Sequence, residues 1–245
     1  MKNTPTPKDI LGHIPAGRVL DVATGNGGFI HFLLEGLQDY TEIIGVDNNE
    51  RAAAAFAEAF RENPKIHFQK MDAGQLDFND SSFDLVCISN SLHHLDTSTS
   101  LSAGSLPVLR EMKRVLRPGG FLLVSEMVRD RQTETQMTHV LLHHWWAAVD
   151  TVSGIVHRET YQRRELVELA NSLGLENEAA YDLSELEGNP KDPAILAELD
   201  PVFERYIQRA EGHPDLQARG EELRQRVAEI GFHSAATLVL IGRKV

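Results

Sequence analysis

Short apolar runs alternate with longer amphipathic segments along the first half of the chain. Short apolar runs are typical of strands buried on both faces, and the longer segments carry apolar residues at helical spacing. The pattern predicts helices over 29–37, 50–60 and 105–116, and strands over 18–22, 42–46, 66–70, 84–89 and 121–126. Regular alternation of strand and helix predicts a parallel sheet with helices on both faces, which binds ligands beyond the carboxyl ends of its strands.

The second half of the chain is mostly helical in pattern. A helix is expected over 133–152, and Thr160 is expected to cap another helix that ends before Gly174. Two further helices, over 194–210 and 215–230, are separated by Gly212-His213-Pro214, and two more strands are predicted over 175–182 and 235–243. We also expect Pro118-Gly119-Gly120 to close the helix over 105–116.

Composition and charge disfavour several classes of function. The chain has 42% hydrophobic and 24% charged residues, an ordinary globular balance, and its net charge is −12. This charge disfavours binding to nucleic acid or to an anionic membrane. The single cysteine, Cys87, lies in an apolar run, which predicts a buried, inert thiol. The first fifteen residues lack the apolar core of a signal peptide, and no apolar run approaches membrane-spanning length, so a cytoplasmic protein is expected.

A glycine turn after the first strand carries the candidate chemistry. Asp21 ends that strand, and Gly25-Asn26-Gly27-Gly28 leads into the next helix. Glycines let the backbone approach a ligand, and a helix N-terminus offers free N–H groups. Asp47 ends the second strand, 22 residues after Gly25. An acid at this spacing accepts hydrogen bonds from ribose hydroxyls in nucleotide-binding folds, which predicts a cofactor that contains a ribose.

Two common nucleotide sites fit the turn poorly. A dinucleotide fingerprint needs glycine or alanine where Ile30 stands, and a phosphate-binding loop needs Gly-Lys-Ser/Thr, which is missing. Asp21 would also repel a pyrophosphate. S-adenosylmethionine (SAM) has no phosphate and carries two positive charges that acidic groups favour, so the residues are compatible with SAM.

These and later segments give a family resemblance. The chain resembles the class I SAM-dependent methyltransferases, especially the small-molecule subgroup that includes quinone-biosynthesis enzymes. The matching segments, in the family's order over residues 19–127, are VLDVATGNGGF, IIGVDNN, MDAGQLDF, SSFDLVCISNSLHHL and VLRPGGFLLVSE. The resemblance implies an α/β fold with a doubly wound, seven-stranded, mostly parallel, Rossmann-like sheet, helical cap insertions, and an antiparallel strand pair at 175–182 and 235–243.

The same resemblance implies a division of the chain. Residues 1–128 would form the SAM-binding core, and residues 129–160 a helical cap insertion. Residues 161–245 would complete the core, with a second helical insertion at about 185–232.

The resemblance also implies roles for single residues. Asp21, Ala23 and Gly25 would line the methionine part of SAM, with Asn26 beside them; the family has glycine where this chain has Ala23. Asp47 would hold the ribose hydroxyls. The remaining expected cofactor residues are Asn48, Met71, Asp72 and Ala73 around the adenine, and Ser89 and Asn90 near the sulfonium.

Histidines are the candidates for the acceptor side. His93 and His94 follow the fourth strand; His94 either contacts the substrate or acts as a base, or the pair is a loop and packing feature. On the helix over 133–152, one stripe holds His139, His143, Trp146 and Asp150, and the opposite, apolar stripe, predicted to be core, holds Met137, Leu141, Trp145, Ala148 and Val152.

The histidine stripe is interpreted as a pocket wall, a solvated face or a dimer surface. We take His93, His94, His143 and Trp146 as substrate residues. His139 and His143 with Asp150 have partial metal-ligand spacing, but the glutamate of HExxH is missing, and no metal is predicted.

The sequence therefore predicts a SAM-dependent methyltransferase that acts on a small-molecule acceptor and releases S-adenosyl-L-homocysteine. One alternative is a SAM-binding regulatory or scaffold module without methyl transfer. Another is a nucleic-acid or protein methyltransferase, although Ser89-Asn90-Ser91-Leu92 lacks the prolines of base N-methyltransferases. A nucleotide-binding oxidoreductase is disfavoured by the incomplete glycine fingerprint. The expected protein is a monomer or homodimer without a nucleic-acid or membrane partner.

Overall fold

The computed structural model describes residues 4–95 and 106–245. Within these ranges seven strands form one sheet in the order β3-β2-β1-β4-β5-β7-β6. The strands are β1 (Arg18–Val22), β2 (Glu42–Asp47), β3 (Ile66–Lys70), β4 (Phe83–Ser89), β5 (Leu116–Met127), β6 (Glu176–Leu183) and β7 (Thr237–Arg243). β1 to β5 pair in parallel, and β7 runs antiparallel to both β5 and β6. The predicted doubly wound sheet with its terminal antiparallel pair is confirmed.

Alternating side chains along the strands build the two layers that cover the sheet. Leu20 and its neighbours on one face belong to a cluster that includes residues of α5 (Pro107–Val115) and α7 (Arg163–Ser172). Val19 and its neighbours on the other face belong to a second cluster. That cluster includes residues of three helices: α1 (Pro7–Leu11), α2 (Gly28–Gly36) and α3 (Glu50–Phe60). Cys87 is buried in this second layer, as predicted.

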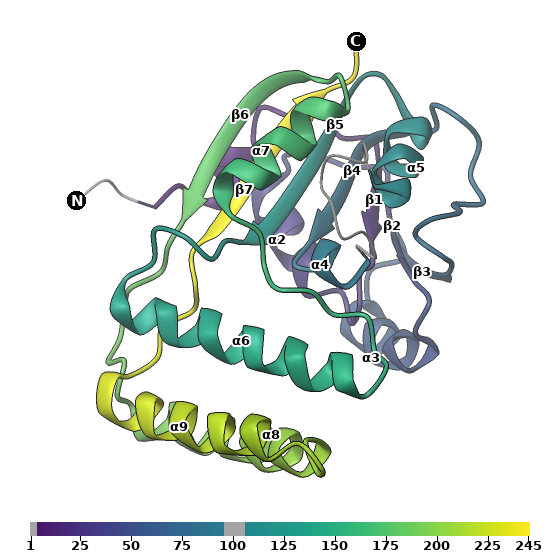
Figure 1. The fold of residues 1–245 in the computed structure, drawn as a ribbon. Coiled ribbons are helices and arrows are strands. Elements are labelled where there is room, and N and C mark those ends of the chain that lie inside the picture. Colours follow the sequence, from purple (N-terminus) through teal and green to yellow (C-terminus); the bar gives the residue numbers. More distant parts are fainter. Residues whose placement is uncertain (1–3, 96–105) are drawn as a thin grey trace.

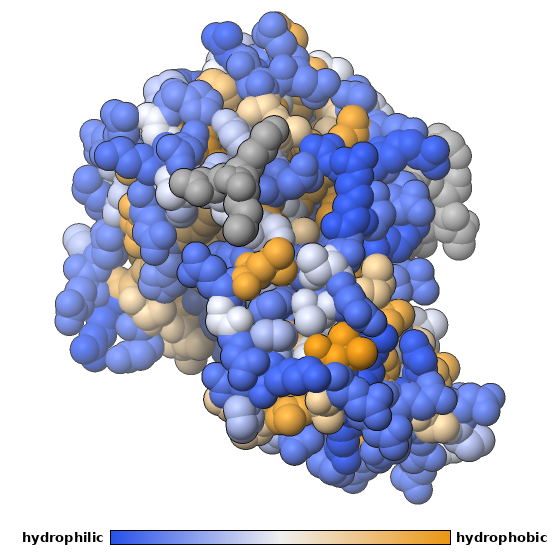
Figure 2. All heavy atoms as spheres, turned by 90° about the vertical axis from the view of Figure 1, so that its left-hand side faces the viewer, coloured by the Kyte–Doolittle hydropathy of each residue, from blue (hydrophilic) through white to orange (hydrophobic). Residues whose placement is uncertain are grey.

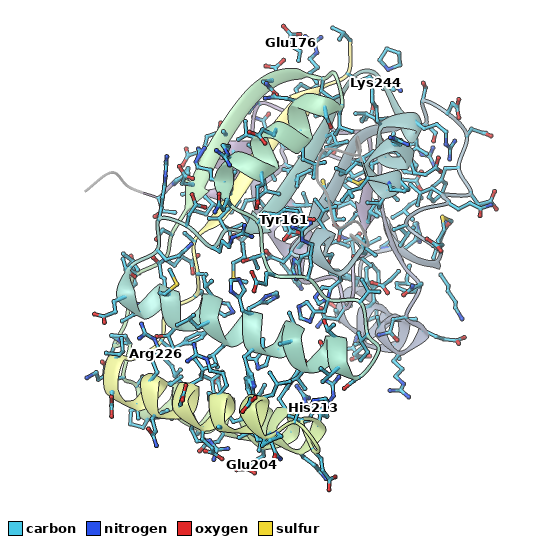
Figure 3. All side chains as sticks on the ribbon, in the orientation of Figure 1. Tyr161, Glu176, Glu204, His213, Arg226 and Lys244 are labelled. Atoms are coloured by element: carbon cyan, nitrogen blue, oxygen red, sulfur yellow. The ribbon has the colours of Figure 1, made fainter. Side chains whose placement is uncertain are left out.

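Three helices form a cap below the sheet in Figure 1. They are α6 (Glu134–Val152), α8 (Pro193–Arg209) and α9 (Pro214–Ile230). Leu142, Trp145 and Val149 of α6 form one hydrophobic cluster with residues of α8 and α9. Arg226 of α9, labelled in Figure 3, donates a hydrogen bond to Thr138 of α6 over 3.1 Å. The helices α8 and α9 therefore fix α6 from below, while its other side faces the sheet.

Three local expectations are wrong. Pro118-Gly119-Gly120 does not close a helix but lies within β5, which begins at Leu116 and changes register against β4 there. Helix α7 is capped by Gln162, because Thr160 is buried and its hydroxyl bonds to His144. Val152, expected in the core, is 45% exposed at the end of α6. The expected start of α5 at residue 105 lies outside the described residues.

The surface carries no broad apolar area on the face seen in Figure 2, where hydrophobic residues form small separate groups among hydrophilic ones. Among the described residues, no helix is both long and apolar enough to cross a membrane.

The contact between α6 and α9 gives a stability prediction. A Cβ at Gly220 would lie 2.4 Å from Cζ2 of Trp145 and 2.8 Å from Cγ1 of Ile207. The indole of Trp145 is held by a hydrogen bond to the Leu216 carbonyl, so it cannot easily move away. Overpacking costs about 1–3 kcal/mol, against about 1 kcal/mol gained in helix propensity. The difference between the two contributions is a net loss, so we expect Gly220→Ala to lower the free energy of unfolding by up to about 2 kcal/mol in urea titrations.

The matched control is Gln225→Ala at an exposed position of the same helix, which should change stability little. Equal stability of the Gly220→Ala variant and the wild type would contradict the close contact.

Candidate functional site

The segments after β1, β2, β3 and β4 meet at one edge of the sheet, because parallel strands end on the same side. This edge collects the expected cofactor residues, and hydrogen bonds tie its loops together. The amide of Gly25 donates to Oδ2 of Asp47 over 2.9 Å, and the amide of Met71 donates to the Asp47 carbonyl over 3.0 Å. Ser91 Oγ donates to the Ala23 carbonyl over 3.3 Å. The loops are thus fixed relative to one another.

The glycine turn contains several residues with left-handed backbone conformation. Ala23 has φ 55°, Gly25 has φ 54° and Gly27 has φ 86°. A left-handed conformation costs a residue with a Cβ about 1–2 kcal/mol. This cost explains why the family that the chain resembles has glycine at the position of Ala23. The ring of Phe60 lies 2.4 Å from where a Cβ at Gly27 would be, so this position requires glycine for space as well.

Asp47 has a structural role in addition to the one expected from the resemblance. Its Oδ2 accepts from the Gly25 amide, and its Oδ1 accepts from the Asn49 amide over 2.8 Å. Asn49 caps α3 by accepting from the Arg51 amide. Each carboxylate oxygen has further lone pairs for a ligand hydroxyl. Asp47 therefore holds the turn in place at the point where a ribose is expected.

Asp21 is buried beneath the turn, with 1% of its surface exposed. Thr24 donates a hydrogen bond from Oγ1 to Oδ2 of Asp21 over 2.6 Å. Burial raises the pKa of Asp21 to about 7, against the opposing effect of the Thr24 hydrogen bond, and the nearby Asp47 charge adds to the rise. Asp21 is therefore a carboxyl group whose charge a cationic ligand would stabilise.

The segment after β3 borders a small pocket. Oδ1 of Asp72 accepts from the Gly74 amide over 2.7 Å, and Ala73 is buried. The pocket has a volume of about 150 Å³ and is lined by Asp72, Ala73, Gly74, Leu95, Leu106, Pro107 and Val108. Asn26, Asn48 and Asn90 are exposed at the same edge, whereas Met71 and Ser89 are half-buried.

Glu126, at the end of β5, is a functional candidate that the sequence analysis missed. It is fully buried and accepts three hydrogen bonds: from the Ser91 amide at 2.9 Å, the Leu92 amide at 2.6 Å, and Nδ1 of His93 at 2.8 Å. The available signal was an acidic residue at the end of the apolar run FLLVSE. Such a residue lies at the ligand-binding edge of a parallel sheet.

A cluster of four histidines lies between this edge and the cap; we call it the histidine cluster. His93 and His94 come from α4 (Leu92–Leu95), His143 from α6, and His157 from the segment after α6. Nε2 of His143 lies 3.1 Å from Nε2 of His93 and 3.2 Å from Nε2 of His157. Nδ1 of His157 lies 2.6 Å from Oδ2 of Asp150, whose other oxygen pairs with Arg209 of α8.

Burial favours the neutral form of three of these rings, those of His94, His143 and His157. Burial, together with the charges of His93 and His157, lowers the pKa of His94 to about 3. The pKa of His143 falls well below its ordinary value, first through burial and then through its histidine neighbours. Burial also lowers the pKa of His157, although the hydrogen bond to Asp150 opposes that shift. The rings of His94, His143 and His157 thus present lone pairs at neutral pH.

Of the residues predicted to contact the acceptor, the structure brings together His93, His94 and His143. Trp146 lies near them, with its ring centroid 6.3 Å from that of His143. Its indole N–H is buried and has no partner among the described residues. A buried donor of this kind needs a water or ligand oxygen.

The stripe of α6 is therefore an inner wall and not a solvated face, since His143 and Asp150 are 7% and 6% exposed. His139 does not join the cluster, because its Nδ1 accepts from the Ala235 amide. Sequence spacing on one helix suggested His139, His143 and Asp150 as a group. In the structure the partners of His143 come from other segments.

Residues 19–120 match a family model described as "Methyltransferase domain". The chain is 38% identical over 118 residues to a demethylmenaquinone methyltransferase from Beutenbergia cavernae, a match that covers 48% of this chain and 44% of the relative. It is 31% identical over 121 residues to a ubiquinone/menaquinone biosynthesis C-methyltransferase from Vibrio campbellii, with 48% and 44% coverage. The chain thus matches less than half the length of these curated relatives.

Solved structures share the fold over nearly the whole chain. A putative methyltransferase from Bacillus halodurans matches with a TM-score of 0.61 and 18% identity, covering 95% of this chain and 94% of that one. A geranyl diphosphate methyltransferase in complex with SAM matches with a TM-score of 0.55 and 15% identity, covering 98% and 84%. A protein described as a [4+2]-cyclase matches with a TM-score of 0.57 and 20% identity, covering 97% and 78%. These likenesses extend the fold assignment to the cap.

The buried carboxyl of Asp21 generates a prediction on pH. Its folded pKa of about 7 lies above its ordinary value of 3.8, so the folded protein binds a proton that the unfolded chain releases. The free energy of unfolding contributed by Asp21 therefore falls as pH rises from about 4 to about 7. We expect Asp21→Asn to gain stability relative to the wild type across this range, measured by urea unfolding at pH 5, 6, 7 and 8.

The control for Asp21→Asn is Asp39→Asn at an exposed site, which should show no such trend. A stability difference between Asp21→Asn and the wild type that stays constant with pH would refute the raised pKa.

Proposed function

We propose that the chain is a class I SAM-dependent methyltransferase, which binds SAM and transfers its methyl group to a small organic acceptor. The observation that carries the proposal is the pair of acids, Asp21 and Asp47, at neighbouring strand ends around the left-handed turn. The pair suits a cofactor with a positive charge and a ribose, and it disfavours a pyrophosphate at the same turn.

The proposed cofactor contacts follow the edge of the sheet. Asp21, Ala23, Gly25 and Asn26 would line the methionine part, and Asp47 would bind the ribose hydroxyls. The adenine end would use Asn48, Met71, Asp72 and Ala73, with Ser89 and Asn90 towards the sulfonium. In support, these residues come from the ends of β1 to β4, and hydrogen bonds hold their loops together.

Methyl transfer is a displacement at carbon, so the main tasks of the enzyme are to align the acceptor with the methyl group and to exclude water. The histidine cluster and Trp146 would form the acceptor side. The three helices of the cap lie entirely outside residues 19–120, the segment that matches the family model. The names of the quinone-methylating relatives therefore bear on the cofactor half, and acceptor choice would rest on α6, α8 and α9.

Two alternative functions compete with the proposed one. A SAM-binding module without methyl transfer has the same cofactor edge, and the shared fold of a protein described as a [4+2]-cyclase shows that this fold does not determine the reaction. A nucleic-acid or protein methyltransferase would need a surface for a large substrate. We favour a small acceptor because three of the four histidines in the cluster are buried beneath the cap and the net charge is −12.

Calorimetric titration tests the cofactor. We expect SAM and S-adenosylhomocysteine to bind and NAD not to bind. Asp47→Ala should weaken SAM binding about 10- to 100-fold, because it removes a charged hydrogen-bond acceptor and loosens the turn. Asp77→Ala, at an exposed site after β3, is the control and should bind SAM as the wild type does. Heat on adding NAD but none on adding SAM would rule out the proposal.

His94→Ala tests the acceptor side. A pKa of about 3 makes His94 a weak base at neutral pH, so we expect a contact role: KM for the acceptor rises several-fold and kcat falls less than about 10-fold. Turnover is measured as S-adenosylhomocysteine released, with exposed His13→Ala as control. A fall in kcat of about 10²- to 10⁴-fold with an unchanged KM would instead assign His94 as the base.

A further inference from the structure

We infer that the Nε2 atoms of His93, His143 and His157 form a binding site for one divalent transition-metal ion. The three nitrogens come from α4, α6 and the segment after α6, and they meet in a buried space between the sheet edge and the cap.

The spacing of the nitrogens fits a tetrahedral ion. Imidazole nitrogens bind zinc at about 2.0–2.1 Å, which places two ligand atoms of a tetrahedron about 3.3–3.4 Å apart. The observed separations are 3.1 Å between His143 and His93 and 3.2 Å between His143 and His157. All four histidines of the cluster offer a ring nitrogen within 4.8 Å of the others.

The hydrogen bonds on the far side of the rings aim lone pairs at the centre. Nδ1 of His93 donates to Glu126, and Nδ1 of His157 donates to Asp150. A neutral imidazole that donates through Nδ1 has a lone pair on Nε2. Carboxylates bonded in this way to the outer nitrogen are the usual support of metal-bound histidines.

His143 completes the set. Its Nδ1 has no hydrogen-bond partner among the described residues, so no contact there fixes its tautomer. When His93 and His157 carry their protons on Nδ1, where the carboxylates accept them, only Nε2 of His143 can carry a proton. The three Nε2 atoms then share at most one N–H. The space between the nitrogens therefore accommodates a single small cation, and a metal ion can replace that one proton.

The ligand set selects the class of metal. Three imidazoles suit zinc, iron, cobalt, nickel or copper, whereas magnesium and calcium prefer oxygen ligands. Three buried protein ligands leave a fourth position for an outside ligand. His94 is on the exposed side of the cluster, with its ring centroid 4.2 Å from that of His157.

The site adjoins the proposed cofactor edge. His93 is two residues from Ser91, whose hydroxyl bonds to the Ala23 carbonyl of the glycine turn. If the proposed function holds, the fourth position would bind an oxygen of the acceptor, so the acceptor class would be an alcohol, enol or carboxylate. This assignment of the acceptor rests on the proposed function, but metal binding itself does not.

The test uses full-length protein without a histidine tag, stripped with a chelator and titrated with Co²⁺, then with Zn²⁺ as competitor. We expect one Co²⁺ per chain, visible absorption bands of a four-coordinate ion, and displacement by Zn²⁺. His143→Gln removes a ligand and should weaken binding at least 100-fold. Asp150→Asn keeps all ligands but alters the support of His157, and should weaken binding about 10- to 100-fold. Exposed His67→Gln is the control.

Thermal unfolding without metal checks that each variant folds. The inference is overturned if the wild type binds Co²⁺ no more tightly than the His143→Gln variant does. It is also overturned if His143→Gln and Asp150→Asn both bind Co²⁺ as the wild type does. If a variant does not fold, the absorption spectrum and stoichiometry of the wild type decide. SAM titration of the same samples separates the two proposals: SAM binding without Co²⁺ binding removes only the metal site, and the reverse removes only the proposed function.

Discussion

The carboxylate of Glu126 is the contact on which the candidate site depends. A fully buried charge is tolerated only when its hydrogen bonds are satisfied, and Glu126 accepts from two backbone amides and from His93. These bonds fix the start of α4 against the end of β5. Because Ser91 also bonds to the turn after β1, the same carboxylate links the proposed cofactor edge to the histidine cluster. A change at Glu126 would therefore affect both.

The candidate site has two halves, one formed by the edge of the sheet and one formed by the cap. Its cofactor edge consists of loops between parallel strands, and their position follows from the sheet. Its proposed acceptor side depends on α6, which is held in place from below by α8 and α9 through Trp145 and its apolar neighbours. Arg209 of α8 also reaches through to Asp150, which orients His157. Packing within the cap thus sets the geometry of the histidines.

Unfavourable local features gather where a ligand is expected. Ala23 is in a left-handed conformation, and Asp21 is buried with a raised pKa. Such strain persists where the surroundings over-determine it, and here the bonds of Asp47 to Gly25 and Asn49 hold the turn. A cationic cofactor would relieve the cost of ionising Asp21, so binding and stability are coupled at this position.

The sequence by itself determined the sheet, the order of its elements and the acids at its edge, because apolar periodicity and strand ends are local properties of the chain. It misjudged Pro118-Gly119-Gly120 and Thr160, where pairing with β4 and burial override local propensity. It missed Glu126 and the partnership of His157 with His93 and His143. Glu126 is 33 positions from His93 along the chain, and His143 is 50 positions from it. Only the packing of α4, α6 and the segment after α6 against the edge of the sheet decided that their side chains converge.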